Sequence, residues 1–125
     1  MLIDSNIIIY AAKPEYPELR AFVAAHTPAV SAISYVEVLG YHQLPPDERH
    51  LLETFFAVAP LLDVTLPILQ QAVQLRQQRK MALGDSLVAG TALVHHLTLV
   101  TRNTKDFVWV PNLKLFNPFD EREPP

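Results

Sequence analysis

Short apolar segments alternate with helical patterns from one end of this chain to the other, and this alternation restricts the fold more than any other feature. The apolar segments are too short for helices, and proline or polar turn residues bound several of them. Five are predicted as strands, at 2–4, 29–31, 61–64, 97–100 and 112–116. Cap residues predict one helix that begins at residue 5, and helical spacing predicts five more at 18–26, 34–43, 47–58, 68–80 and 84–95.

The alternation predicts an α/β fold of three layers, with a short central parallel sheet between two layers of helices. Ligands of such sheets bind at the edge where the strands end. The chain has 125 residues and no internal repeat, so we expect one domain over 1–117. The remaining residues, 118–125, are predicted to form an acidic, proline-containing tail.

Composition excludes several classes of protein. The chain has no cysteine, which leaves only oxygen or imidazole ligands for a metal. No apolar run reaches the roughly 18 residues of a membrane-spanning helix, so we expect no membrane segment. A strand begins where a secretory signal would lie, so we expect a cytoplasmic protein. The net charge of -3 argues against nucleic-acid binding through overall charge. A nucleic-acid substrate would require acids concentrated in one site.

Four acidic residues are placed where they can meet at the ligand-binding edge of the sheet. One ends the first strand, one lies in the first turn of its helix, one starts the helix before the fourth strand, and one follows that strand: Asp4, Glu37, Asp85 and Asp106. Clustered carboxylates raise one another's pKa, and a hard divalent cation such as Mg²⁺ or Mn²⁺ relieves that cost. Such a cluster can activate water and neutralise charge on a phosphodiester.

Some of these residues also have a purely structural interpretation. Ser34 and Glu37 have the spacing of a capping box, and both roles are compatible. Asp85 follows Gly84 at a helix start, where the helix dipole favours an acid. Asp4 is the strongest functional candidate, because an acid at the end of an apolar strand is rarely placed there for solvation.

Basic residues flank two of the acids. Five of them are candidates for contacts with a nucleic-acid backbone: Arg76, Arg79, Lys80, Arg102 and Lys105. The alternative is a solvated helix end with cations near its C-terminus.

Four segments of the sequence resemble, in order, the motifs of PIN-domain ribonucleases. The segments are 2–11, 33–40, 84–89 and 101–107, and the similarity is greatest to VapC-type toxins of toxin–antitoxin pairs. The resemblance implies RNA cleavage with Mg²⁺ or Mn²⁺, a homodimer and a cognate antitoxin that blocks the site. It also implies that Asp4 and Asp85 are the principal metal ligands and that Glu37 is the third acid.

The fourth position of the motif set departs from the family pattern. The family often has an acid where this chain has Asn103, so either Asp106 supplies the charge or Asn103 is a neutral ligand. By the same resemblance, Thr101 would hold a phosphate or water, and Asn6 is a further candidate for such a contact.

Two other classes of function remain as alternatives. A receiver-like phospho-acceptor module would use Asp63 on the third strand, although the paired acids that it needs after the first strand are absent. A catalytically inactive PIN-like interaction domain would have lost an acid of the site, and Asn103, at a position where the family often has an acid, is the one residue that fits this alternative. Phe55, Phe56 and Val58 crowd one helix end, so we expect either an exposed dimer patch or burial in the core.

Overall fold

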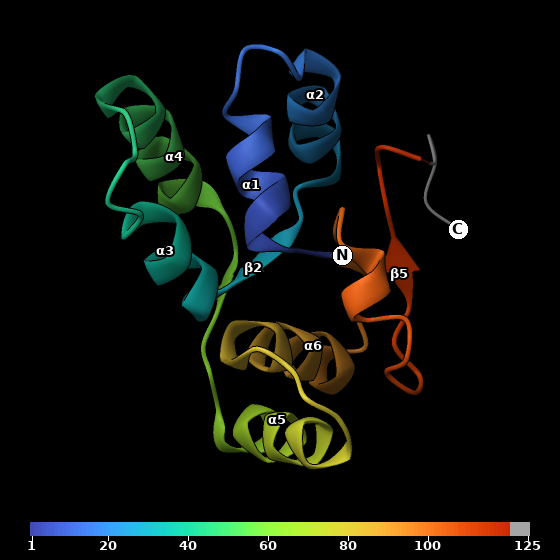
Figure 1. Ribbon diagram of the computed structural model, residues 1–125. Coiled ribbons are helices and arrows are strands. Elements are labelled where there is room, and N and C mark those ends of the chain that lie inside the picture. Colours follow the sequence, from blue (N-terminus) through green and yellow to red (C-terminus); the bar gives the residue numbers. More distant parts are fainter. Residues whose placement is uncertain (121–125) are drawn as a thin grey trace.

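A computed structural model describes residues 1–120 and shows the predicted three-layer α/β/α arrangement (Figure 1). All strand pairs are parallel, and the strand order is β3-β2-β1-β4-β5. The strands are short: β1 (Leu2–Ile3), β2 (Ala29–Ser31), β3 (Leu61–Leu62), β4 (Leu99–Val100) and β5 (Leu115–Phe116).

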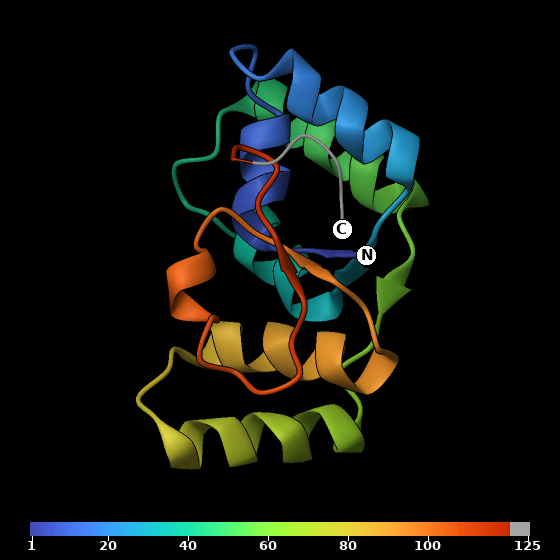
Figure 2. The same ribbon diagram turned by 90° about the vertical axis from the view of Figure 1, so that its right-hand side faces the viewer.

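Helices cover both faces of the sheet. Three lie on one face: α1 (Ser5–Ala11), α2 (Pro17–His26) and α4 (Pro46–Val58). Two pack side by side on the other: α5 (Leu66–Gln78) and α6 (Leu83–His95) (Figure 2). Helix α3 (Ala32–Leu39) contacts α1, α4 and α6, and a 3₁₀ turn, η1 (Thr104–Asp106), follows β4.

The sheet divides the core into two clusters because successive strand residues point to opposite faces. Ile3 and Val100 pack with the α1, α2 and α4 cluster. Their neighbours Leu2 and Leu99 pack with the α5 and α6 cluster instead. All four side chains are fully buried, which fixes the register of the two central strands and therefore the positions of the residues that follow them.

The helix predicted at 34–43 is wrong in its bounds and in its cap. The observed helix α3 begins earlier and ends at Leu39, with Ser31 accepting a hydrogen bond from the Ile33 N–H as the N-cap. Ser34 lies inside the helix and is fully buried, so the predicted capping box with Glu37 does not form. Glu37 is in the second helical turn, not the first.

Of the two alternatives for the end of α4, an exposed patch or burial in the core, the structure shows packing into the core for both phenylalanines. Phe56 is buried in the core, and Phe55 packs against it with ring centroids 5.3 Å apart. Only Val58 of the three is strongly exposed, at 81%.

The first residues of the tail predicted at 118–125 pack against the rest of the domain. Phe119 packs against the core cluster and lies edge-on to Tyr10 and Tyr16. Residues 121–125 of that predicted tail lie outside the described part of the chain. Within the described part, no helix is long and apolar enough to cross a membrane.

Candidate active site

The candidate site lies where β1 and β4 end side by side. The connections from these neighbouring strands run in opposite directions across the sheet, since β2 and β3 lie beyond β1 and β5 lies beyond β4. Open α/β sheets bind ligands at such a point. Asp4 directly follows β1 and Thr101 directly follows β4, so the topology itself places both residues at this edge.

Asp4 is a buried carboxylate held by three hydrogen-bond donors. Its Oδ1 accepts from the Ser5 N–H at 2.8 Å, and its Oδ2 accepts from the Thr101 hydroxyl at 2.9 Å and from the Asn6 amide at 3.2 Å. Burial raises the pKa of Asp4 above its ordinary 3.8, Thr101 and Ser5 lower it, and repulsion from Glu37 and Asp106 raises it. The donors fix the carboxylate while the neighbouring acids disfavour its charge.

Asn6 connects the two strands at this edge. Its amide nitrogen also donates to Thr101 Oγ1 at 3.3 Å, and its Oδ1 accepts from the Arg102 N–H at 3.3 Å. Thr101 is fully buried, and its hydroxyl oxygen also accepts from the Asn103 N–H at 3.1 Å. The Thr101 hydroxyl therefore contacts Asp4, Asn6 and Asn103.

Glu37 reaches the same site from α3. Its Oε1 accepts a hydrogen bond from the Ser5 hydroxyl at 2.8 Å, and Ser5 directly follows Asp4. Its Oε2 lies against Gly84, where an added Cβ would be only 2.5 Å away. Glu37 therefore lies between Asp4 and Asp85 in space, although its own side chain is solvent-exposed.

Asp85 is the acid whose titration the cluster changes most clearly. It lies in the first turn of α6 and is half-buried. Burial, followed by repulsion from Asp4, Asp106 and Glu37, raises its pKa from 3.8 to about 6. The single ion pair among residues 1–120 joins Lys13 to Glu48, so none of these acids is ion-paired with a lysine or arginine there.

The fourth motif forms the turn after β4. Asp106 ends η1, and its N–H donates to the Asn103 carbonyl at 3.0 Å, which places the two residues one 3₁₀ turn apart. Both side chains are exposed. Asp106 raises the pKa of Asp4 and of Asp85 by repulsion, so its charge acts on both acids.

The structure places three of the five basic candidates against other protein groups. Arg76 Nε donates to the Met81 carbonyl at 3.1 Å. The Arg79 guanidinium lies 5.0 Å from the centre of the Trp109 ring. The Arg102 guanidinium lies 4.3 Å from the centre of the Phe119 ring and 4.9 Å from that of Tyr10. Lys80 and Lys105 are exposed.

Sequence analysis missed three residues that shape the site. Ser5 and Ser34 contact each other through their hydroxyl oxygens at 3.0 Å, and neither had been assigned a site role. Gly84 had been treated only as the residue before Asp85. A glycine in the first turn of a helix was the available signal, because glycine weakens a helix and often marks a close approach.

Comparisons with known proteins agree with this fold. The family model described as PIN domain matches residues 1–111. Ribonuclease VapC2 from Rickettsia felis is 29% identical over 128 residues, covering 93% of this chain and 96% of the relative.

Two solved structures are similar along nearly the whole chain. A toxin–antitoxin complex from Klebsiella pneumoniae has a TM-score of 0.73 and 29% identity, covering 94% of this chain and 96% of that one. VapBC2 from Rickettsia felis, bound to a DNA fragment from its promoter, has a TM-score of 0.78 at 23% identity and covers 93% and 96%. The family match spans most of the sequence, the fold agrees with it, and the chain belongs to the PIN domain family.

Proposed function

We propose that this PIN domain is a metal-dependent endoribonuclease that hydrolyses RNA phosphodiester bonds as the toxin of a type II toxin–antitoxin pair. One observation carries the proposal: Glu37 and Asp106, from two further segments, act by repulsion on both Asp4 and Asp85 at the ligand-binding edge of the sheet, and none of the four acids forms an ion pair among residues 1–120. The similarity to Ribonuclease VapC2 supports RNA as the substrate.

The donor set suits Mg²⁺ or Mn²⁺. The groups are carboxylate, amide and hydroxyl oxygens, which hard divalent cations prefer. Asp4 and Asp85 would hold the ion, with Glu37 and either Asp106 or Asn103 completing the site. Among residues 1–120 no three acidic side chains form a ready-made cage, so ligand side chains would adjust on binding. When bound, the ion supplies activation of water and neutralisation of charge on the phosphate.

The other groups of the site position Asp4. Thr101 and Asn6 donate to its Oδ2, and the Ser5 N–H donates to its Oδ1. These contacts support a positioning role for Thr101 and Asn6, and the contact with phosphate or water that the resemblance implies for Thr101 stays a prediction. Preorganised ligands matter because small displacements of reacting groups reduce rates strongly.

Positive charge around the site would guide the RNA backbone. Lys80 and Lys105 are exposed and are the simplest candidates for phosphate contacts. Arg102 directly follows Thr101 and is exposed, and its guanidinium lies over aromatic rings that hold it near the site. Arg76 and Arg79 would contribute mainly to the local potential.

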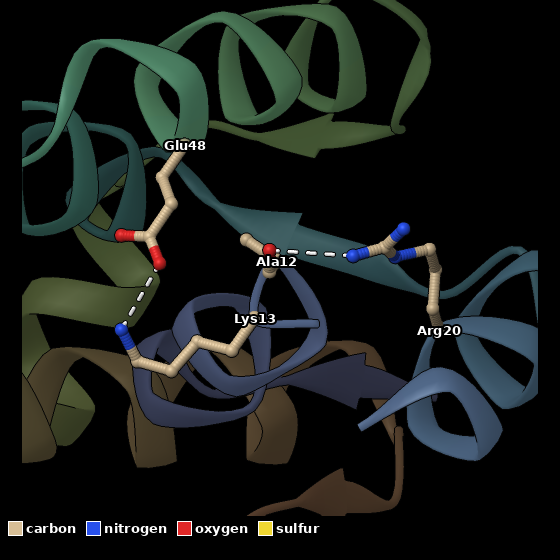
Figure 3. A network of polar contacts seen from close by, with 4 residues as sticks. All are labelled: Ala12, Lys13, Arg20 and Glu48. Atoms are coloured by element: carbon tan, nitrogen blue, oxygen red, sulfur yellow. Dashed lines mark hydrogen bonds and ion pairs between the residues drawn. The ribbon is translucent and has the colours of Figure 1, made fainter. Parts of the chain in front are cut away.

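An apolar groove of about 370 Å³ between α1, α2 and α4 suits an antitoxin segment. Polar contacts tie these three helices together (Figure 3). Lys13 pairs with Glu48 of α4 at 3.1 Å, and Arg20 of α2 donates to the Ala12 carbonyl at the end of α1 at 3.3 Å. Similar structures solved as toxin–antitoxin complexes support this occupant.

We also propose that the protein acts in the cytoplasm.

We propose a homodimer whose interface lies on α5 and not at the end of α4. Leu66, Leu69 and Val73 follow helical spacing along one side of α5 and are 65%, 44% and 55% exposed. An apolar stripe of this kind is typical of an interface between two copies.

The receiver-like alternative has no support in the structure. Asp63 follows the edge strand β3 and is not among the groups that change the pKa of Asp4 or Asp85. The inactive interaction domain is the alternative that requires an experiment. Single-stranded RNA incubated with the purified chain and Mn²⁺ should be cleaved, and chelator should stop cleavage. Intact RNA at saturating Mn²⁺ would favour the inactive domain.

A further inference from the structure

The position of the Glu37 carboxylate depends on residues outside the acidic set. Helix α3 is not a neighbour of Asp4 in sequence, and Glu37 is solvent-exposed, so burial does not hold its side chain. Two contacts define where the carboxylate lies. Ser5 donates to its Oε1 at 2.8 Å, and the backbone of Gly84 lies beside its Oε2.

The two serines form a directed chain of hydrogen bonds. Each hydroxyl has one proton, and Ser5 uses its proton toward Glu37. Ser34 therefore donates to Ser5 at an oxygen–oxygen distance of 3.0 Å. Ser34 is fully buried one helical turn before Glu37, so a fixed part of α3 orients the hydroxyl that holds the Glu37 side chain.

Gly84 provides space that no other residue would leave. A Cβ at this position would lie 2.5 Å from Oε2 of Glu37, closer than real Cβ atoms come to other heavy atoms, and 3.3 Å from Cδ, which is tighter than most real contacts. The backbone of Gly84 is helical with an ordinary negative φ, so its conformation does not require glycine. The requirement is the close approach of the Glu37 carboxylate.

We propose that Ser34, Ser5 and Gly84 are positioning residues that fix the Glu37 carboxylate between Asp4 and Asp85. This inference rests on the proposed function, since it concerns the third acid of the same site. The hydroxyl chain holds one oxygen of the carboxylate, and the missing Cβ of Gly84 admits the other. The arrangement makes Glu37 available to an ion or to its water without burying its charge.

Gly84→Ala separates positioning from folding. Alanine favours a helix over glycine, so the unfolding temperature of this variant should equal or exceed that of the wild type. The Cβ would displace the Glu37 carboxylate by about 1 Å, a shift that costs about 100-fold in rate when it affects a reacting group. We expect Mn²⁺ affinity, measured by calorimetry without RNA, to fall about tenfold and cleavage of single-stranded RNA to fall about 10- to 100-fold. Leu83→Ala, at an exposed neighbouring position, should leave both unchanged.

Two further sets of variants keep the test independent of any folding defect. Glu37→Asp should weaken Mn²⁺ binding in the wild-type background but cost little more in Gly84→Ala, because the shorter side chain retracts from the new Cβ. Ser5→Ala and Ser34→Ala should each lower Mn²⁺ affinity by about 3- to 10-fold, and Ser5→Thr should restore it. Thr91→Val removes a buried hydroxyl that bonds only within α6 and should not change Mn²⁺ affinity.

The outcomes separate this inference from the proposed function. Wild-type Mn²⁺ affinity and cleavage in Gly84→Ala would overturn the inference while leaving the ribonuclease assignment intact. Equal costs of Glu37→Asp in both backgrounds would also overturn it. A wild-type chain that binds no Mn²⁺ and cuts no RNA would contradict the proposed function itself.

Discussion

The Thr101 hydroxyl donates a hydrogen bond of 2.9 Å to Asp4 Oδ2 across a sequence separation of 97 residues. Both residues directly follow neighbouring parallel strands, and both side chains are buried. The bond connects the first and the last motif of the site through the two central strands. It also lowers the pKa of a carboxyl that burial and its acidic neighbours would otherwise raise further.

Thr101→Val should weaken metal binding by loosening Asp4. The substitution keeps the shape of the side chain and removes the donor, which leaves a buried carboxylate with one partner fewer and costs about 1–3 kcal/mol. The pKa of Asp4 should rise further, so Mn²⁺ binding should require a higher pH. Calorimetry between pH 5 and pH 8 measures this shift. Thr91→Val is the matched control, and equal pH profiles for the two variants would contradict the role of Thr101.

Asp85→Asn should stabilise the metal-free protein at neutral pH. The pKa of Asp85 rises from 3.8 to about 6 on folding, so the folded state binds this proton more tightly than the unfolded chain does. Stability from this group is therefore highest below pH 4 and falls as the pH rises to about 6 and above. With allowance for its partial exposure, removing the charge should gain about 1–2 kcal/mol at pH 7.5 and little at pH 4.

Thermal melts in chelator at the two pH values test this effect. The gain in melting temperature on adding Mn²⁺ should be smaller for Asp85→Asn than for the wild type, because an ion ligand is lost. Asp47→Asn, in the exposed first turn of α4, should show neither change. Melts of Asp85→Asn that match the wild type at both pH values would mean that the carboxylates do not converge.

The choice between Asp106 and Asn103 can be decided by paired variants. The two residues lie one 3₁₀ turn apart, and only Asp106 adds charge near Asp4 and Asp85. We expect Asp106→Asn to weaken Mn²⁺ binding and single-turnover cleavage by about tenfold or more, with a smaller effect of Asn103→Ala. The reverse order would assign the ligand position to Asn103. Wild-type values for both would remove the fourth motif from the site.

The homodimer can be tested on α5. Val73→Glu places a charge in the middle of the exposed stripe formed with Leu66 and Leu69. Light scattering should give about twice the 14.1 kDa chain mass for the wild type at micromolar concentration and a single-chain mass for the variant. Val58→Glu, at the more exposed end of α4, is the control and should stay dimeric. A wild-type particle of one chain mass would contradict the dimer.

Sequence patterns were sufficient for the layers and for the meeting of the acids. Strand and helix periodicity located the five strands and the six α-helices but not the 3₁₀ turn η1, and parallel topology brought Asp4 and Asp85 to one edge. The bounds of α3 were misjudged because Ser34 matches a capping signature, whereas Ser31 is the actual cap. Local pattern could not distinguish the two serines, since the burial of Ser34 depends on packing against residues distant in sequence.

The remaining parts of the site depend on contacts that no local pattern encodes. The Ser5 hydroxyl reaches Glu37 over 32 positions, and the Glu37 carboxylate lies against Gly84, far from it in sequence. The sequence around Phe55 and Phe56 does not show whether their side chains are exposed or buried. Their burial depends on how α4 packs against the rest of the core.

The most direct test of the account is single-turnover cleavage of a labelled single-stranded RNA by wild type and Asp4→Asn, with the Mn²⁺ affinity of each measured in the same buffer. Asp4→Asn removes the charge of the best-held carboxylate, so we predict at least about a 100-fold loss of cleavage together with weaker Mn²⁺ binding. Asp47→Asn should retain wild-type values. Equal cleavage by Asp4→Asn and the wild type would contradict the assignment of this site as the nuclease centre.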